Sequence, residues 1–207
     1  MELKRGSFPR FYFLSNDELI DILANSTNLD IIQQHMKTCF DNIVRIDIVD
    51  GIDIEAMNSG EKEKVKFKKN LKARGQVELW LDALQGEMIN TLWWLLKAGV
   101  ADYDNQERTK FVQEHKGQIV ATVCQIMWRR QSEIAIEEQG LNPLALQDWL
   151  DINIQQIEQL TALVRGELSD ILRRIIVALV TVDVHARDIV DELRGLSVSS
   201  INEFKWL

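Results

Sequence analysis

The strongest constraint on this chain is a long helical repeat of apolar residues in its last third. Ten aliphatic residues from Leu150 to Val182 recur at a mean spacing of about 3.56 residues, close to one turn of an α-helix. Asn142-Pro143 precedes the repeat and is typical of a cap residue followed by a proline in the first turn. The repeat predicts a single helix approaching 50 Å, at about 1.5 Å per residue, with Gly166 as its only weak point.

Helical patterns cover most of the remaining chain as well. Ser15 and Glu18 have the spacing of a capping box, which predicts that a helix begins there. An apolar stripe begins after Gln76 and predicts a long amphipathic helix. Further helices are expected at residues 30–40, 117–138 and 199–204.

One short region carries the signal of a β-sheet. Two alternating apolar runs flank Asp50-Gly51, a pair typical of a two-residue hairpin turn in which both central residues need positive φ. A third run, Val65–Phe67, follows a charged turn and is compatible with another strand. Upstream, Phe8–Phe13 is short and aromatic, and we expect an extended segment tucked into a core.

The predicted fold class is therefore mainly α: an elongated helical bundle or rod that carries a β-hairpin or three-stranded sheet as an insertion. We divide the chain into an N-terminal segment with helices (1–42), the β insertion (43–74) and a long-helix bundle (75–207).

Composition excludes several classes of function. With 24 basic and 32 acidic residues the formal charge is −8, which argues against a nucleic-acid binder or a clamp on anionic membranes. The longest uncharged run, Gly117–Trp128, is shorter than the roughly 18 residues that a membrane span needs. Cys39 and Cys124 lie in helical patterns far apart in the sequence, as expected for buried thiols in a reducing compartment. We expect a soluble intracellular protein.

No pattern of catalytic, cofactor-binding or metal-ligating residues is found. The sequence contains neither of the two standard phosphate-binding loops, Gly-x-x-x-x-Gly-Lys-Ser/Thr and Gly-x-Gly-x-x-Gly. It also has no Cys-x-x-Cys and no His-Glu-x-x-His, and its three histidines fall in separate helical segments. Carboxylate pairs such as Asp148 and Asp151 lie where helices usually face solvent, whereas a catalytic pair needs burial to separate its pKa values.

Two groups of residues are candidates for binding a partner. Lys66, Lys68 and Lys69 form a basic patch on the β insertion, which either protects a strand edge from pairing or docks on an acidic surface. Trp93 and Trp94 fall off the apolar stripe of their helix. They are either buried between two layers of helices or exposed as a contact surface.

Several longer strings carry a resemblance to a known family. Residues 8–19, Phe-Pro-Arg-Phe-Tyr-Phe-Leu-Ser-Asn-Asp-Glu-Leu, resemble the start of the C-terminal half of the linker in dynein heavy chains. Similar strings follow at residues 75–81, 117–128, 183–188 and 199–207, in the same order as in that family. The His-Ala-Arg-Asp form at 185–188 is more similar to axonemal than to cytoplasmic dyneins.

The resemblance implies a mechanical role. In dyneins the linker arches over a ring of AAA+ modules and moves between bent and straight forms as ATP is bound and hydrolysed. ATP and Mg²⁺ would then be bound in the AAA+ modules and not by this chain, which would have no catalytic site. The implied partners are the ring of the same heavy chain, microtubules, and dynein intermediate and light chains, in the cytoskeleton of a ciliary or flagellar axoneme.

The resemblance also implies where parts of such a lever would lie. Lys66, Lys68, Lys69, Trp93 and Trp94 become candidates for docking on the ring, and Leu207 would lead into the first AAA+ module. Gly99 and Gly140 are candidate hinges, because glycine costs a helix about 1 kcal/mol relative to alanine. The alternatives are a free-standing helical adaptor that binds through Trp93, Trp94 and the basic hairpin, or a helical enzyme with an unrecognised site.

Overall fold

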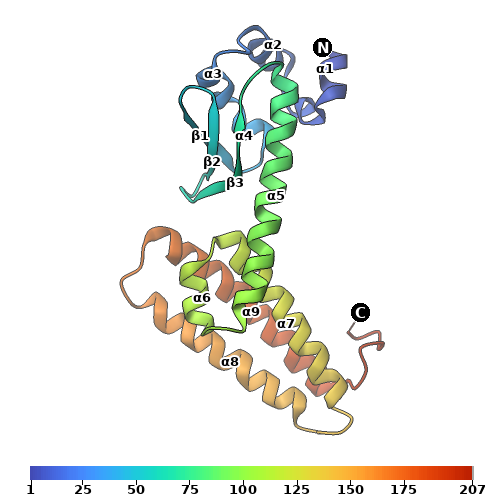
Figure 1. Ribbon diagram of the computed structural model, residues 1–207. Coiled ribbons are helices and arrows are strands. Elements are labelled where there is room, and N and C mark those ends of the chain that lie inside the picture. The colour runs from blue at the N-terminus through green and yellow to red at the C-terminus, as the bar shows by residue number, and fades with distance from the viewer. Residues whose placement is uncertain (207) are drawn as a thin grey trace. The chain divides into compact units, whose positions relative to one another are not determined.

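The computed structural model describes residues 1–206; Leu207, expected above to lead into a further module, lies outside the described residues. The chain folds as two compact units, Met1–Leu95 and a second unit that begins at Leu96. Their border lies inside one continuous helix, α5 (Val77–Tyr103), which contributes residues to both (Figure 1). We describe each unit by itself.

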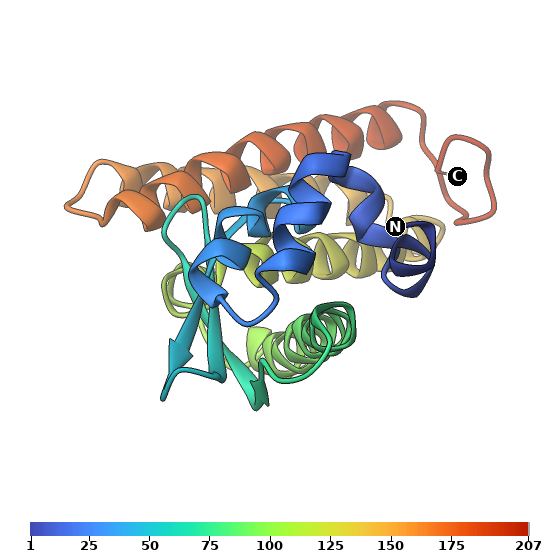
Figure 2. The ribbon, with the colours of Figure 1, turned by 90° about the horizontal axis from the view of Figure 1, so that it is seen from above.

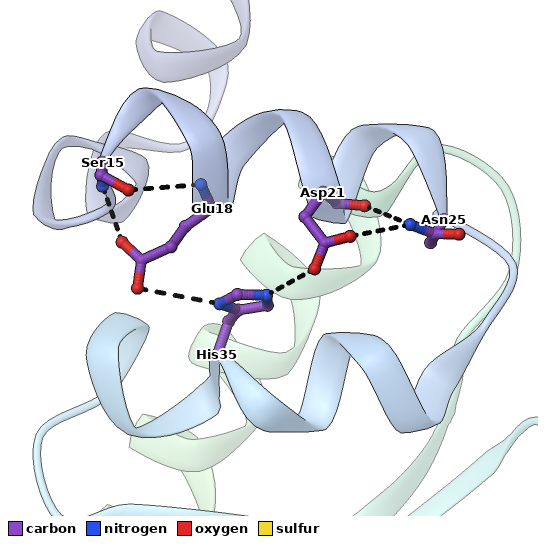
Figure 3. A network of polar contacts seen from close by, with 5 residues as sticks. All are labelled: Ser15, Glu18, Asp21, Asn25 and His35. Carbon is purple, nitrogen blue, oxygen red and sulfur yellow. Dashed lines mark hydrogen bonds and ion pairs between the residues drawn. The ribbon is translucent and has the colours of Figure 1, made fainter.

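The first unit opens with short helices: α1 (Glu2–Ser7), α2 (Asn16–Ala24), α3 (Leu29–Gln34) and α4 (Met36–Cys39). The predicted capping box is confirmed at α2, where Ser15 Oγ accepts from the Glu18 N–H (3.2 Å) and Glu18 Oε2 accepts from the Ser15 N–H (2.8 Å). The prediction of a single helix over residues 30–40 is wrong. The segment forms two helices, α3 and α4, that are separated at His35. The His35 ring lies between Glu18 (4.0 Å) and Asp21 (3.1 Å), as Figure 3 shows.

The segment Phe8–Phe13 is not extended, contrary to expectation. Pro9–Phe13 forms a 3₁₀ helix, η1, because proline fixes a helical φ and Phe8 and Phe11 accept successive i+3 hydrogen bonds of 3.0 and 3.2 Å. The segment is nevertheless tucked into the core. Phe8 and Phe11 are fully buried and meet edge to face, with ring centroids 5.0 Å apart.

The predicted sheet is present with all three strands. The antiparallel order is β1 (Ile43–Val49), β2 (Asp53–Ser59), β3 (Lys64–Lys72). Asp50 and Gly51 both have positive φ (49° and 77°), and the Ile52 N–H donates to the Val49 carbonyl at 3.3 Å, as predicted for the turn. Helices α2 to α4 gather beside the sheet in Figure 2.

The first unit is held together by apolar packing between its short helices, the sheet and the first part of α5. The predicted stripe of α5 is confirmed, since Val77, Trp80, Leu81, Leu84 and Met88 are all buried. Cys39 is a free, buried thiol, as expected, and burial raises its pKa to about 11.

The second unit contains the end of α5, α6 (Arg108–Glu114), α7 (Gly117–Glu138), α8 (Ala145–Val164) and α9 (Asp170–Gly195). The helix predicted at 117–138 is therefore confirmed at both ends. The single long helix predicted for residues 150–182 is wrong. It is two helices, α8 and α9, packed against each other as a hairpin (Figure 1).

The break between α8 and α9 has a local cause. Helix α8 ends at Val164, and the side chain of Arg173 donates to the carbonyls of Val164 (2.7 Å) and Gly166 (3.2 Å). Ser169 then caps α9 by accepting from the Leu172 N–H at 3.3 Å. The apolar repeat is continuous in the sequence because both helices bury a face with the same period.

Two other helix boundaries differ from expectation. Asn142 accepts a hydrogen bond from the Leu144 N–H (3.1 Å) in a turn, and α8 begins only at Ala145. Residues 199–204 form turns and not a helix, because Glu203 Oε1 accepts from the Ser199 and Ser200 N–H groups (2.9 and 3.1 Å) without a following helical turn. No helix in residues 1–206 is long and apolar enough to cross a membrane.

Candidate interaction surface

The basic patch lies on strand β3, at an irregularity in the pairing of this edge strand with β2. Strand β3 pairs with β2 at Lys66 opposite Ala56 and next at Leu71 opposite Ile54, so residues 67–70 bulge out of the ladder. Such a bulge leaves main-chain amides without strand partners, and two of them find partners on α5 instead.

Two polar side chains of α5 satisfy those amides. The Lys68 N–H donates to Thr91 Oγ1 at 3.0 Å, and the Lys69 N–H donates to Glu87 Oε1 at 2.9 Å. The Thr91 hydroxyl in turn donates to Glu87 Oε1 at 3.2 Å. Thr91 and Glu87 are buried, so this brace fixes the bulge onto α5 in a place where water cannot compete freely.

The brace places Lys68 beside Trp94. Lys66, Lys68 and Lys69 are exposed, and Lys68 Nζ lies 6.0 Å from the ring centroid of Trp94. Trp93 and Trp94 are 57% and 48% exposed, so within the first unit they are not buried between helices. We call Lys66, Lys68, Lys69, Trp93 and Trp94 the Trp–Lys surface; it offers two indole faces and a cluster of positive charge.

Sequence reasoning missed the brace, although a signal was available. Glu87 and Thr91 lie on the buried face of α5 among Leu84, Met88 and Leu92. A polar residue on the apolar stripe of a helix requires a buried hydrogen-bond partner, and this requirement could have identified both residues.

The second unit contains a buried ion pair that sequence reasoning also missed. Arg108 and Asp183 form a two-point contact of 2.8 and 2.9 Å, with side chains only 9% and 14% exposed. Burial, the largest single influence, lowers the pKa of Arg108, but the hydrogen bond with Asp183 and the attraction of Cys124, Asp183 and Tyr103 together raise this pKa above its ordinary value. Burial likewise raises the pKa of nearby Tyr103 to about 12 and raises the pKa of the buried free thiol of Cys124.

The two candidate hinge glycines have different surroundings. Gly99 is buried in α5, where an added Cβ would come within 2.9 Å of Ile119 and 3.2 Å of Val123, both on α7. Gly140 lies in the exposed turn after α7, with open space around the position of a Cβ. Gly99 therefore permits close packing of two helices, whereas Gly140 is free of contacts of that kind.

The remaining titratable residues do not converge on a centre. The structure brings His35 to Glu18 and Asp21, and His115 to Asp102 at 2.8 Å, in different units. Asp148 and Asp151 are both exposed, as expected for a solvated helix face. Within residues 1–206, no group of three or more His, Cys, Asp or Glu side chains is placed to hold a metal ion.

Comparison with known proteins identifies the family. Residues 1–99 match the family model described as dynein heavy chain, N-terminal region 2. Along its whole length the chain is 41% identical to human dynein axonemal heavy chain 6, 39% to mouse dynein axonemal heavy chain 3 and 34% to human dynein axonemal heavy chain 1. It spans 6%, 5% and 5% of the lengths of these relatives, respectively. The predicted resemblance is thereby confirmed, and the chain belongs to the dynein heavy-chain family, as part of the N-terminal region of an axonemal-type heavy chain.

Proposed function

We propose that this chain is a segment of the linker of a dynein motor, a mechanical lever that moves between bent and straight forms. The observation that supports the proposal is the position of α5, one continuous helix shared by two compact units. Because one helix belongs to two separate cores, a bend in that helix would change the orientation of one unit relative to the other.

In this proposal the chain responds to ATP but does not bind it. ATP and Mg²⁺ are bound in AAA+ modules elsewhere in the same heavy chain, and nucleotide binding and hydrolysis there bias the lever. The whole motor acts on microtubules together with intermediate and light chains, in a ciliary or flagellar axoneme. The axonemal relatives support this location.

The Trp–Lys surface is the proposed contact with the AAA+ ring. Tryptophan is enriched at the centres of interfaces, where it buries apolar area, and charged side chains such as lysine belong to the polar rim, where they can pair with carboxylates of the partner. The brace from Glu87 and Thr91 fixes the main chain of Lys68 and Lys69, which lowers the entropy lost when those residues bind.

The proposed hinges are Gly99, which lies in α5 just after the border between the two units, and Gly140, which lies in the turn after α7. Gly140 is the second hinge candidate, and a Gly140→Ala variant that leaves stroke amplitude and motility unchanged would eliminate it.

The docking proposal is tested in the full-length motor. Replacing Lys68 by Glu and Trp94 by Ala should slow microtubule gliding, because losing an aromatic anchor costs an interface about 2 kcal/mol, roughly thirtyfold in the docked population. Leu141→Ala, at a 94% exposed position of the second unit, is the matched control and should glide at the normal rate. Unchanged gliding by the Lys68/Trp94 variant would show that the Trp–Lys surface does not dock on the ring.

A further inference from the structure

Three of the five lysines of strand β3 have no acidic partner, and these three belong to the Trp–Lys surface. Of the other two, Lys64 Nζ lies 2.5 Å from a carboxylate oxygen of Asp47, and Lys72 Nζ lies 3.6 Å from one of Asp53. No carboxylate of residues 1–206 lies within 4.0 Å of an ammonium group of the Trp–Lys surface. In a chain of formal charge −8, this unpaired basic cluster is a local reversal of charge that favours an acidic partner.

The register of the sheet explains why these lysines are unpaired. Asn58 of β2 is opposite Lys64, and its side-chain amide donates to Asp47 of β1 at 2.9 Å, so this row of the sheet pairs its own charges. Lys66 is opposite Ala56, whose side chain has no acceptor. The bulge that carries the other two lysines has no paired residue on β2. The sheet therefore gives the three ammonium groups no cross-strand partner.

Two carboxylates close to the bulge in the register or the brace are bound to other donors. Glu55 lies between the two β2 residues that pair with the ends of the bulge, and its Oε1 accepts from the Asn70 side chain at 3.2 Å. Glu87 is buried, and its Oε1 accepts from the Lys69 N–H and from the Thr91 hydroxyl. Neither forms an ion pair with a lysine of the surface, so these charges remain available to a second molecule or segment.

The tryptophans restrict the partner further, since Trp93 and Trp94 expose about half of their area beside these charges. A purely apolar partner would cover the lysines without pairing them, which is costly, and a purely charged partner would leave the indoles in water. Nucleic acid could satisfy both, through base stacking and phosphates, but the net charge of the chain repels a polyanion. A short protein segment with few negative charges avoids this repulsion.

We propose that the Trp–Lys surface binds an acidic protein segment in which an aromatic or aliphatic residue lies between carboxylates. The carboxylates pair with the lysines, and the apolar side chain covers the indoles. The assignment of this segment to the AAA+ ring rests on the docking role proposed above, whereas the chemistry of the segment follows from the unpaired lysines and the exposed indoles.

Three peptides, capped at both ends, test this chemistry. Glu-Glu-Phe-Glu-Glu carries both features, Gln-Gln-Phe-Gln-Gln lacks the charges and Glu-Glu-Ala-Glu-Glu lacks the ring. Each is titrated into the full chain and followed by NMR of the indole N–H signals of Trp93 and Trp94. The first peptide should bind about tenfold more tightly than either of the others, because only it both pairs the lysines and covers the indoles.

Substitutions in the chain show where the peptide binds. Lys68→Gln should weaken the acidic aromatic peptide about threefold and leave the glutamine peptide unchanged. Trp94→Ala should remove the advantage of the phenylalanine peptide over the alanine peptide. The control is Lys110→Gln, which removes the same charge at an exposed position of the second unit and should leave all three affinities unchanged. Unfolding midpoints confirm that the variants fold.

Equal affinities of the three peptides would overturn the proposal, as would tighter binding of a single-stranded oligonucleotide or equal losses in Lys68→Gln and Lys110→Gln. If the acidic aromatic peptide does not bind while the Lys68/Trp94 motor variant glides slowly, the docking role stands and this inference falls. If the peptide binds as expected while that motor variant glides normally, the chemistry of the surface is supported and the ring is not its partner.

Discussion

At the scale of single residues, two buried charges within residues 1–206 are held by a partner of opposite charge. Arg108 meets Asp183 in the second unit, and the buried Glu78 pairs with Lys4 in the first. A buried charge without a partner is costly, since desolvation is not repaid by any attraction. These side chains are therefore sensitive to substitution although none is assigned a chemical role.

Asp183→Ala should destabilise the second unit by about 3–5 kcal/mol, because it leaves the guanidinium of Arg108 buried and unpaired. Urea unfolding followed by circular dichroism measures the change. The control is Asp191→Ala, which breaks the exposed pair with Arg194 and should cost less than about 1 kcal/mol. Equal costs for the two variants would contradict the burial of the Arg108–Asp183 pair.

Tyr103 should titrate far above an ordinary tyrosine. The chain has two tyrosines, so Tyr12→Phe leaves Tyr103 alone, and its absorbance near 295 nm should change with a pKa of about 12, where a free tyrosine has about 10. Burial raises this pKa, so the unfolded chain loses the proton first. The stabilisation is complete below about pH 10 and is lost as the pH rises toward 12. A midpoint near 10 in the folded chain would contradict the burial of the hydroxyl.

At the scale of elements, glycines within one helix have opposite effects. In α5, Gly86 has open space around the position of a Cβ, whereas Gly99 packs against Ile119 and Val123. The same substitution thus separates helix propensity from packing between helices.

Gly86→Ala should stabilise the chain by about 0.5–1 kcal/mol through helix propensity. Gly99→Ala should destabilise it by about 1 kcal/mol, because overpacking against two β-branched side chains costs about 1–3 kcal/mol and exceeds the gain in propensity. Thermal and urea unfolding of both variants measure the difference. A stabilised Gly99→Ala variant would show that α5 and α7 do not pack closely there.

The sequence predicted those elements whose signals are local. The Ser15–Glu18 capping box, the Asp50-Gly51 turn and the 117–138 helix each depend on residues close in the chain, and all were correct. Phe8–Phe13 was assigned to the right place in a core but to the wrong conformation, because its i+3 hydrogen bonds leave no periodic signal in five residues.

Errors arose where a pattern had two structural solutions. The apolar repeat from Leu150 to Val182 fits one helix or a hairpin of two, and only the Ser169 cap and the Arg173 contacts select the hairpin. The exposure of Trp93 and Trp94 could not be predicted either, since their position off the stripe is compatible with a second layer of helices. Periodicity alone encodes neither the local cap that divides two helices nor what covers the outer face of a helix.

At the scale of the whole molecule, the chain consists of two compact units with separate cores and one helix in common. The first unit carries the Trp–Lys surface, and the second carries the buried Arg108–Asp183 pair. The proposed lever action assigns docking on the ring to the first unit.

The central claim is that the two units change their relative orientation during the nucleotide cycle of the motor. It is tested by double electron–electron resonance in the full-length motor, with spin-labelled unnatural amino acids at Asp17 and Glu158, exposed positions in the first and second units. The account predicts distance distributions that differ between the ATP-bound and nucleotide-free states, while a pair within one unit, Asp148 and Asp188, stays constant. The same Asp17–Glu158 distribution in every nucleotide state would contradict it.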